Sequence, residues 1–159
     1  MTRANNVVGT LKGELYPDEW IILGCHYDAW GFGSTDPNSG TAMLLSMAET
    51  MGKMAKEGKR PARSILIAHW DAEEHGVIGS TEWVEQFRDE LGAKAVAYIN
   101  LDAAVSGKYF GTAASPTLKK VIMESAKQVA YPDSAKTVYE VWAAGKAEPS
   151  IGNLGGGSD

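Results

Sequence analysis

The chain has 159 residues, of which 44% are hydrophobic and 22% are charged, a composition typical of one globular domain. The formal net charge is -5, and no cluster of Lys and Arg is present, which argues against a nucleic-acid partner. No run of about 18 or more apolar residues occurs, so we expect no membrane-spanning segment in this chain. Cys25 is the single cysteine, which excludes an internal disulfide.

Both ends of the chain lack the features of a natural domain boundary. The N-terminal residues do not have the charged-then-apolar pattern of a signal peptide. The C-terminus stops in the glycine-rich stretch NLGGGSD, which has no helix or strand pattern. We therefore expect residues 1–159 to be the N-terminal and central part of one catalytic domain, incomplete at its C-terminus.

The first half of the chain alternates between strand and helix patterns. The apolar run Trp20–Cys25 is typical of a strand buried on both faces. Apolar residues repeat at three- and four-residue steps over residues 41–57, which predicts a helix, and Gly58 and Pro61 end it. In chain order the sequence predicts a strand at 6–11, a turn at 14–19, a strand at 20–25, a helix at 41–57 and a strand at 64–70.

The second half continues this alternation with a weaker signal at its end. The sequence predicts a helix at 80–91, a strand at 95–101, a short strand at 108–112 and a helix at 116–130, with proline at its first position. No element is predicted after Tyr131. Strands that alternate with helices predict an α/β domain with a largely parallel central sheet.

Polar side chains follow three of the predicted strands at the point where each strand ends. They are His26, Asp28 and Asp36 after the strand at 20–25, Asp71, Glu73 and Glu74 after the strand at 64–70, and Asn100 and Asp102 at the end of the strand at 95–101. In open α/β sheets, ligands bind beyond the carboxyl ends of the strands. Carboxylates packed so closely need protonation or a cation. His with Asp and Glu, and no thiolate, suits zinc, or else manganese or cobalt.

The spacing of these residues suggests how a metal site could be arranged. His26 and Asp28 lie two residues apart, so Asp28 can orient one imidazole nitrogen while the other binds metal. Asp36 precedes proline, where a cis peptide costs only about 0.5–1 kcal/mol and would turn the carboxylate toward the metal. The side chains of Glu73 and Glu74 diverge, so one can bind metal while the other serves as a general base. We expect Asp71 to have a structural role in the turn.

Three segments resemble those of a known family. HYDAWGFGSTDPNSG, WDAEEHGVIGSTEW and AYINLD are similar to the ligand segments of the co-catalytic zinc exopeptidases, which include bacterial zinc aminopeptidases and glutamate carboxypeptidase II. The resemblance covers nearly the whole chain. It implies a three-layer αβα sandwich with a mainly parallel, mixed central sheet. It also implies a peptide substrate, a homodimer in the full-length protein, and an extracellular or periplasmic location.

The resemblance also implies a role for each matching residue. His26 and Asp102 bind the first zinc, Asp36 bridges two zinc ions, and Glu74 binds the second. Glu73 is the general base that takes a proton from a water bridging the metals, and Asp28 is the partner of His26. Gly157, Ser158 and Asp159 resemble the segment that lines the substrate cleft. The second zinc needs a further histidine, which neither His69 nor His75 matches, so we expect weak binding at the second site and little activity.

Other functions remain open from the sequence. One alternative is a non-catalytic relative, like the transferrin receptor, that binds protein, or an inactive fragment that holds one metal only. The presence of every ligand expected within these residues argues against a receptor of that kind. Another alternative is a different metal-dependent enzyme on the same scaffold, such as a cyclising transferase. The resemblance does not separate aminopeptidase from carboxypeptidase action.

Overall fold

The computed structural model describes residues 3–159 and divides them into two compact units. The first unit runs to Ser106 and includes Gly157–Asp159, and the second is Gly107–Gly156. Every candidate metal ligand and catalytic residue lies in the first unit. The single catalytic domain expected over residues 1–159 stays a prediction.

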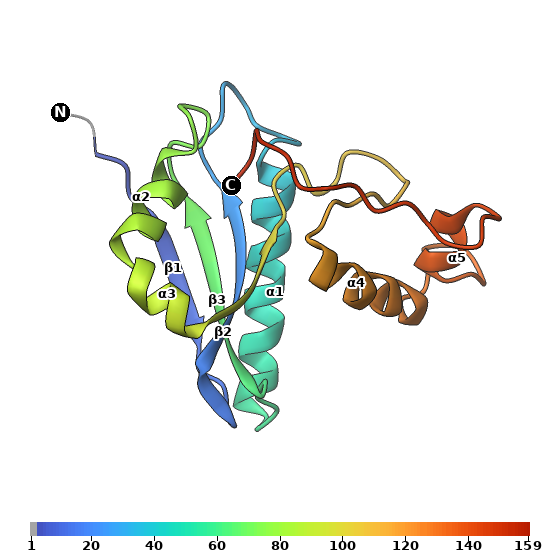
Figure 1. Ribbon diagram of the computed structural model, residues 1–159, viewed down its shortest axis with the longest axis horizontal. Coiled ribbons are helices and arrows are strands. Elements are labelled where there is room, and N and C mark those ends of the chain that lie inside the picture. The colour runs from blue at the N-terminus through green and yellow to red at the C-terminus, as the bar shows by residue number, and fades with distance from the viewer. Residues whose placement is uncertain (1–2) are drawn as a thin grey trace. The chain divides into compact units, whose positions relative to one another are not determined.

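The first unit is built on a four-stranded mixed sheet (Figure 1). In chain order its strands are β1 (Val7–Leu11), β2 (Tyr16–His26), β3 (Arg63–Trp70) and β4 (Ala95–Asn100). They are arranged in the order β1-β3-β2-β4. β2 is parallel to both β3 and β4, while β1 pairs antiparallel with β3. The prediction of a mainly parallel, mixed sheet is confirmed.

Helices cover both faces of this sheet (Figure 1). On one face α1 (Asn38–Lys56) buries Leu44 against Leu23 and Cys25 of β2. On the other face lie α2 (Ile78–Gln86) and α3 (Arg88–Lys94), which pack Trp83 and Leu91 against the apolar side chains of β2 and β3. The expected three-layer αβα arrangement is therefore present.

Two predictions in the first unit need correction. β2 begins at Tyr16, so residues 16–19 of the predicted turn belong to the strand. A register shift lies between Tyr16 and Trp20, where the sequence has no continuous apolar pattern, so the start of the strand could not be recognised from the sequence. The single helix predicted at 80–91 is two helices that meet at Phe87, whose backbone leaves the helical region with φ -106° and ψ 20°. The Phe87 ring packs against the Trp83 ring, with ring centroids 5.4 Å apart.

The second unit contains α4 (Pro116–Gln128) and α5 (Val138–Ala143). The strand predicted at 108–112 is wrong, because these residues form no regular strand. α5 has no counterpart among the elements predicted from the sequence, although its start has a capping box in which Thr137 and Glu140 exchange hydrogen bonds. Across residues 3–159, no helix combines the length and apolar character needed to cross a bilayer.

Candidate metal centre

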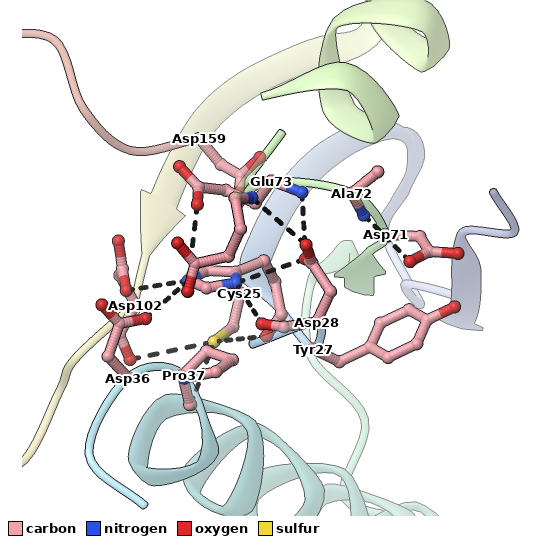
Figure 2. Close-up of polar contacts among 12 residues, drawn as sticks. Cys25, Tyr27, Asp28, Asp36, Pro37, Asp71, Ala72, Glu73, Asp102 and Asp159 are labelled. Atoms are coloured by element: carbon pink, nitrogen blue, oxygen red, sulfur yellow. Dashed lines mark hydrogen bonds and ion pairs between the residues drawn. The ribbon is translucent and has the colours of Figure 1, made fainter. Parts of the chain in front are cut away.

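The candidate site lies where the three parallel strands end. β2 ends at His26, β3 is followed by Asp71–Glu74, and β4 is followed by Asp102. Because these strands run in the same direction, their carboxyl ends meet at one edge of the sheet. Figure 2 shows Asp36, Glu73 and Asp102 directed toward one another, while Asp71 lies apart from them beside Tyr27.

His26 is the centre of the cluster. Its Nε2 lies 3.0 Å from Oδ1 of Asp36 and 3.1 Å from Oδ1 of Asp102. Donor atoms of these three residues all lie within 4.8 Å of one another. Ligands bound to a tetrahedral zinc at about 2.0–2.1 Å are separated by about 3.3 Å, so the spacing of these atoms fits a shared zinc ion. The cis Asp36–Pro37 peptide suggested by the sequence is present.

The imidazole of His26 is almost completely buried, with 1% of its side chain exposed. Its Nδ1 lies 3.0 Å from the backbone oxygen of Asp28 and 3.5 Å from the Asp28 carboxylate. Donation from Nδ1 to this oxygen leaves the Nε2 lone pair free to bind a metal. The orienting contact expected from the Asp28 carboxylate is therefore made mainly by the backbone carbonyl of the same residue.

Charge in the cluster favours a cation at His26. Burial lowers the pKa of this histidine, but the hydrogen bond and the charge of Asp102, with the charge of Glu73, outweigh burial and raise the pKa overall. Negative charge from the surrounding carboxylates thus converges on Nε2 of His26. A metal ion would satisfy the same negative charge, and the donor set of one imidazole and carboxylate oxygens suits zinc.

The Asp28 carboxylate connects the two loops that carry the site residues (Figure 2). Its Oδ1 accepts a hydrogen bond from the backbone N–H of Glu73 at 2.9 Å, and its Oδ2 accepts one from Glu74 at 3.2 Å. These bonds hold the turn after β3 against the loop after β2. Asp28 therefore positions the backbone of Glu73 in addition to contacting His26.

Glu73 lies beside the group formed by His26, Asp36 and Asp102 and is nearly buried, with 10% of its side chain exposed. Its Oε2 is 3.9 Å from Nε2 of His26. Burial raises the pKa of the Glu73 carboxyl, and the charges of Asp159, Asp102 and Glu74 raise it further against the opposing effect of His26. A carboxylate with a raised pKa next to a metal position is well suited to accept a proton.

Glu74 is not part of the three-residue donor group. It lines an open depression of about 370 Å³ together with Asp36, Gly31, Gly33 and Trp30. The two acids expected at a second metal thus face the same depression. Of the other histidines, His75 packs against Trp30 with ring centroids 4.8 Å apart, and His69 lies within β3.

The structure adds contacts that the strand-end motifs did not indicate. Ser158 donates a hydrogen bond to Oδ2 of Asp102, and Ser80 donates one to Oδ1 of Asp159 at 2.5 Å. Resemblance alone had pointed to Ser158 and Asp159, because a glycine-rich stretch has no periodicity that would place it. The expected structural role of Asp71 is confirmed, since its carboxylate accepts hydrogen bonds from the backbone of Asn5 and Ala72.

Comparison with known proteins identifies the family. Two curated relatives are a probable glutamate carboxypeptidase of Arabidopsis thaliana, 48% identical over 158 residues, and an aminopeptidase of Mus musculus, 40% identical over 167 residues. These matches cover 99% and 98% of this chain but only 23% and 22% of the relatives. The chain therefore spans less than a quarter of their length.

The fold is also found in solved structures. A zinc aminopeptidase from Bacillus subtilis matches with a TM-score of 0.67 at 22% sequence identity, covering 96% of this chain and 35% of that one. An aminopeptidase from an Aneurinibacillus strain matches with a TM-score of 0.60 at 22% identity, covering 93% and 41%. The model of peptidase family M28 matches residues 6–146. The chain belongs to peptidase family M28.

Proposed function

We propose that this chain carries the central catalytic residues of a zinc-dependent exopeptidase. The observation that supports this most directly is the convergence of His26, Asp36 and Asp102 on one point, with the nearly buried Glu73 carboxylate beside it. Family membership and the relatives named as carboxypeptidase and aminopeptidase support the same reaction class. The substrate is then a peptide, cleaved next to one of its ends.

His26, Asp36 and Asp102 would hold the first zinc, and Asp36 and Glu74 would contribute to a second. Asp36 and Glu74 are joined by no histidine that matches the second zinc site, so we expect the second ion to bind more weakly than the first. Bound zinc supplies a Lewis acid that acidifies water and polarises the scissile carbonyl. This division of roles explains why the carboxylates outnumber the histidines at the strand ends.

Glu73 is the proposed general base. Its carboxylate takes a proton from the attacking water while the water oxygen bonds to the scissile carbonyl carbon. Glu73 then returns that proton to the leaving amine as the carbon–nitrogen bond breaks. Asp28 holds the Glu73 backbone through the 2.9 Å hydrogen bond, so the base keeps its direction during both transfers. The depression lined by Trp30 and Asp36 offers an open approach for a peptide end.

The test is zinc content and turnover measured in parallel on the full-length protein, because residues 1–159 alone are expected to have little activity. A panel of peptides with varied N- and C-terminal residues, analysed by mass spectrometry, identifies which end is cleaved. Glu73→Gln should keep zinc but lose turnover by about 100-fold or more, the usual scale of general-base catalysis. Glu85→Gln, an exposed change on α2, is the control and should behave as the unaltered protein.

Each other outcome would revise the proposal. Turnover retained in Glu73→Gln would remove Glu73 from the role of base. Zinc bound without cleavage of any peptide, but with a cyclised product, would favour a transferase. Absence of zinc in the unaltered protein would favour a non-catalytic, receptor-like relative.

A further inference from the structure

A chain of four hydrogen bonds leads from the core of the sheet to Asp102. The indole Nε1 of Trp70 donates to the Tyr98 hydroxyl at 3.0 Å, and that hydroxyl donates to Oδ1 of Asn100 at 3.1 Å. Nδ2 of Asn100 donates to Oγ of Ser158 at 2.6 Å, and Ser158 donates to Oδ2 of Asp102. The strands β3 and β4 are thereby joined to the segment Gly157–Asp159 and to a proposed metal ligand.

The direction of every bond in this chain is fixed by its two ends. An indole N–H can only donate, and an ionised carboxylate can only accept. The Tyr98 hydroxyl therefore accepts from Trp70 and donates onward, which also fixes the amide orientation of Asn100. Hydrogen bonds aligned in one direction polarise and strengthen one another. The four hydrogen bonds therefore have one consistent set of donors and acceptors, which requires Oδ2 of Asp102 to be an acceptor.

A glycine in the central strand makes the first bond possible. Gly24 of β2 lies between Trp70 of β3 and Tyr98 of β4, and a Cβ built on it would overlap the Tyr98 hydroxyl. Trp70 itself is 2% exposed and packs against Trp83 with ring centroids 5.1 Å apart. The hydrogen-bond chain thus begins at a residue fixed in the core. It passes from Trp70 to Tyr98 through space that only glycine at position 24 leaves open.

The two oxygens of Asp102 consequently have different environments. Oδ2 accepts from Ser158, while Oδ1 lies 3.1 Å from Nε2 of His26. Building on the proposed zinc site, we infer that Tyr98, Asn100 and Ser158 are positioning residues. They hold Asp102 so that Oδ1 alone points at the metal, which makes Asp102 a one-oxygen ligand and leaves room for water and substrate. Tyr98 acts here from a distance, through Asn100 and Ser158.

The test is the zinc dissociation constant of the full chain, measured by competition with a chelator. Loss of an outer partner of a metal ligand usually weakens metal binding by about 10–100-fold. Ser158→Ala should fall in this range, and Tyr98→Phe should weaken binding about 10-fold. Ser158→Thr keeps the hydroxyl and should restore most of the affinity. Tyr131→Phe is the matched control, because it removes a tyrosine hydroxyl that, within residues 3–159, donates to the backbone oxygen of Lys108 in the second unit.

A double variant separates positioning from general destabilisation. If Tyr98 acts through Ser158, then Tyr98→Phe should change zinc affinity little once Ser158 is already alanine. If Tyr98 had a purely structural role, Tyr98→Phe would lower zinc affinity equally whether residue 158 is serine or alanine. The loss of affinity would then match the unfolded fraction of Tyr98→Phe, which thermal unfolding measures. Equal losses, or no loss in either single variant, would overturn the inference.

Failure of the underlying zinc site would look different. In that case the unaltered chain would not bind zinc, and the zinc affinities of the variants could not be compared with it. The absorption spectrum of the cobalt-substituted protein gives a second readout, because it reports coordination number directly. We expect Ser158→Ala to alter this spectrum as Oδ2 becomes free to bind, whereas Tyr131→Phe should not. An unchanged spectrum in Ser158→Ala would contradict one-oxygen binding by Asp102.

Discussion

The Asp28 carboxylate accepts a hydrogen bond from the backbone N–H of Glu73 at 2.9 Å, and so joins the proposed base to the loop that carries His26. The same carboxylate also accepts from Glu74 at 3.2 Å and lies 3.5 Å from Nδ1 of His26. Asp28 therefore contributes at once to the ligand loop and to the turn that carries both glutamates. Removing its charge should affect the stability of the fold and the geometry of the site together.

Asp28→Asn tests this coupling. An amide nitrogen replaces one carboxylate oxygen and cannot accept a hydrogen bond, so one backbone N–H loses its partner. We expect a loss of about 1–3 kcal/mol in the free energy of unfolding, measured with urea, and weaker zinc binding by about 10-fold or more. Asp71→Asn is the matched control, because Asp71 also accepts two backbone hydrogen bonds. It should lose similar stability but keep its zinc affinity, and equal zinc losses in both variants would contradict the proposed role of Asp28.

Two glycines of α1 should respond in opposite ways to alanine. A Cβ on Gly40 would overlap the backbone oxygens of Leu101 and Asp102, which cannot move without shifting the proposed metal ligand Asp102. A Cβ on Gly52 would meet nothing within 4 Å. We expect Gly40→Ala to destabilise the protein by about 3 kcal/mol and Gly52→Ala to stabilise it by about 0.5–1 kcal/mol. Urea unfolding of both variants checks this pair, and equal effects would show that the contact between α1 and the Asp102 segment is not tight.

His69 should make the stability of the fold depend on pH. Its ring nitrogens are buried without a hydrogen-bond partner among the described residues, and burial lowers its pKa from the usual 6.5. Between pH 6.5 and the lower value, the unfolded chain binds a proton that the folded chain does not, so stability falls as pH falls. The stabilising contribution is fully present above pH 6.5.

His69→Phe removes this titration and the unpaired nitrogens. We expect the variant to be as stable as the unaltered protein at pH 7, or more stable by about 1 kcal/mol, because no buried polar group is left unsatisfied. Its advantage should grow as the pH is lowered from 7 to 5. Urea unfolding of both proteins across this range gives the comparison. Parallel stability curves would contradict a lowered pKa for His69.

The sequence predicts most of the first unit because its elements have strong local patterns. The apolar run at Trp20–Cys25 and the three- and four-residue repeat after Gly40 give β2 and α1, apart from their exact ends. Polar residues directly after buried strands indicate the edge where the site lies. These features depend on neighbours in sequence, which a single chain displays directly.

Features that depend on distant neighbours could not be predicted in this way. Ser158 meets Asp102 across 56 positions of sequence, and Tyr98 meets Trp70 across 28. The second contact also requires a glycine in the strand between them, which is visible only once strand order is known. Likewise no glycine or proline marks the helix break at Phe87 in the sequence.

The most direct test of the proposed metal centre is zinc affinity, measured by calorimetric titration of the unaltered chain and of His26→Gln. His26 provides the nitrogen on which the Asp36 and Asp102 oxygens converge at 3.0 and 3.1 Å. We expect one tightly bound zinc per unaltered chain and a loss of more than about 100-fold in the variant, since even outer partners of a ligand cost about 10–100-fold. Equal affinity in the two proteins, or no zinc binding by the unaltered chain, would contradict a metal centre at His26.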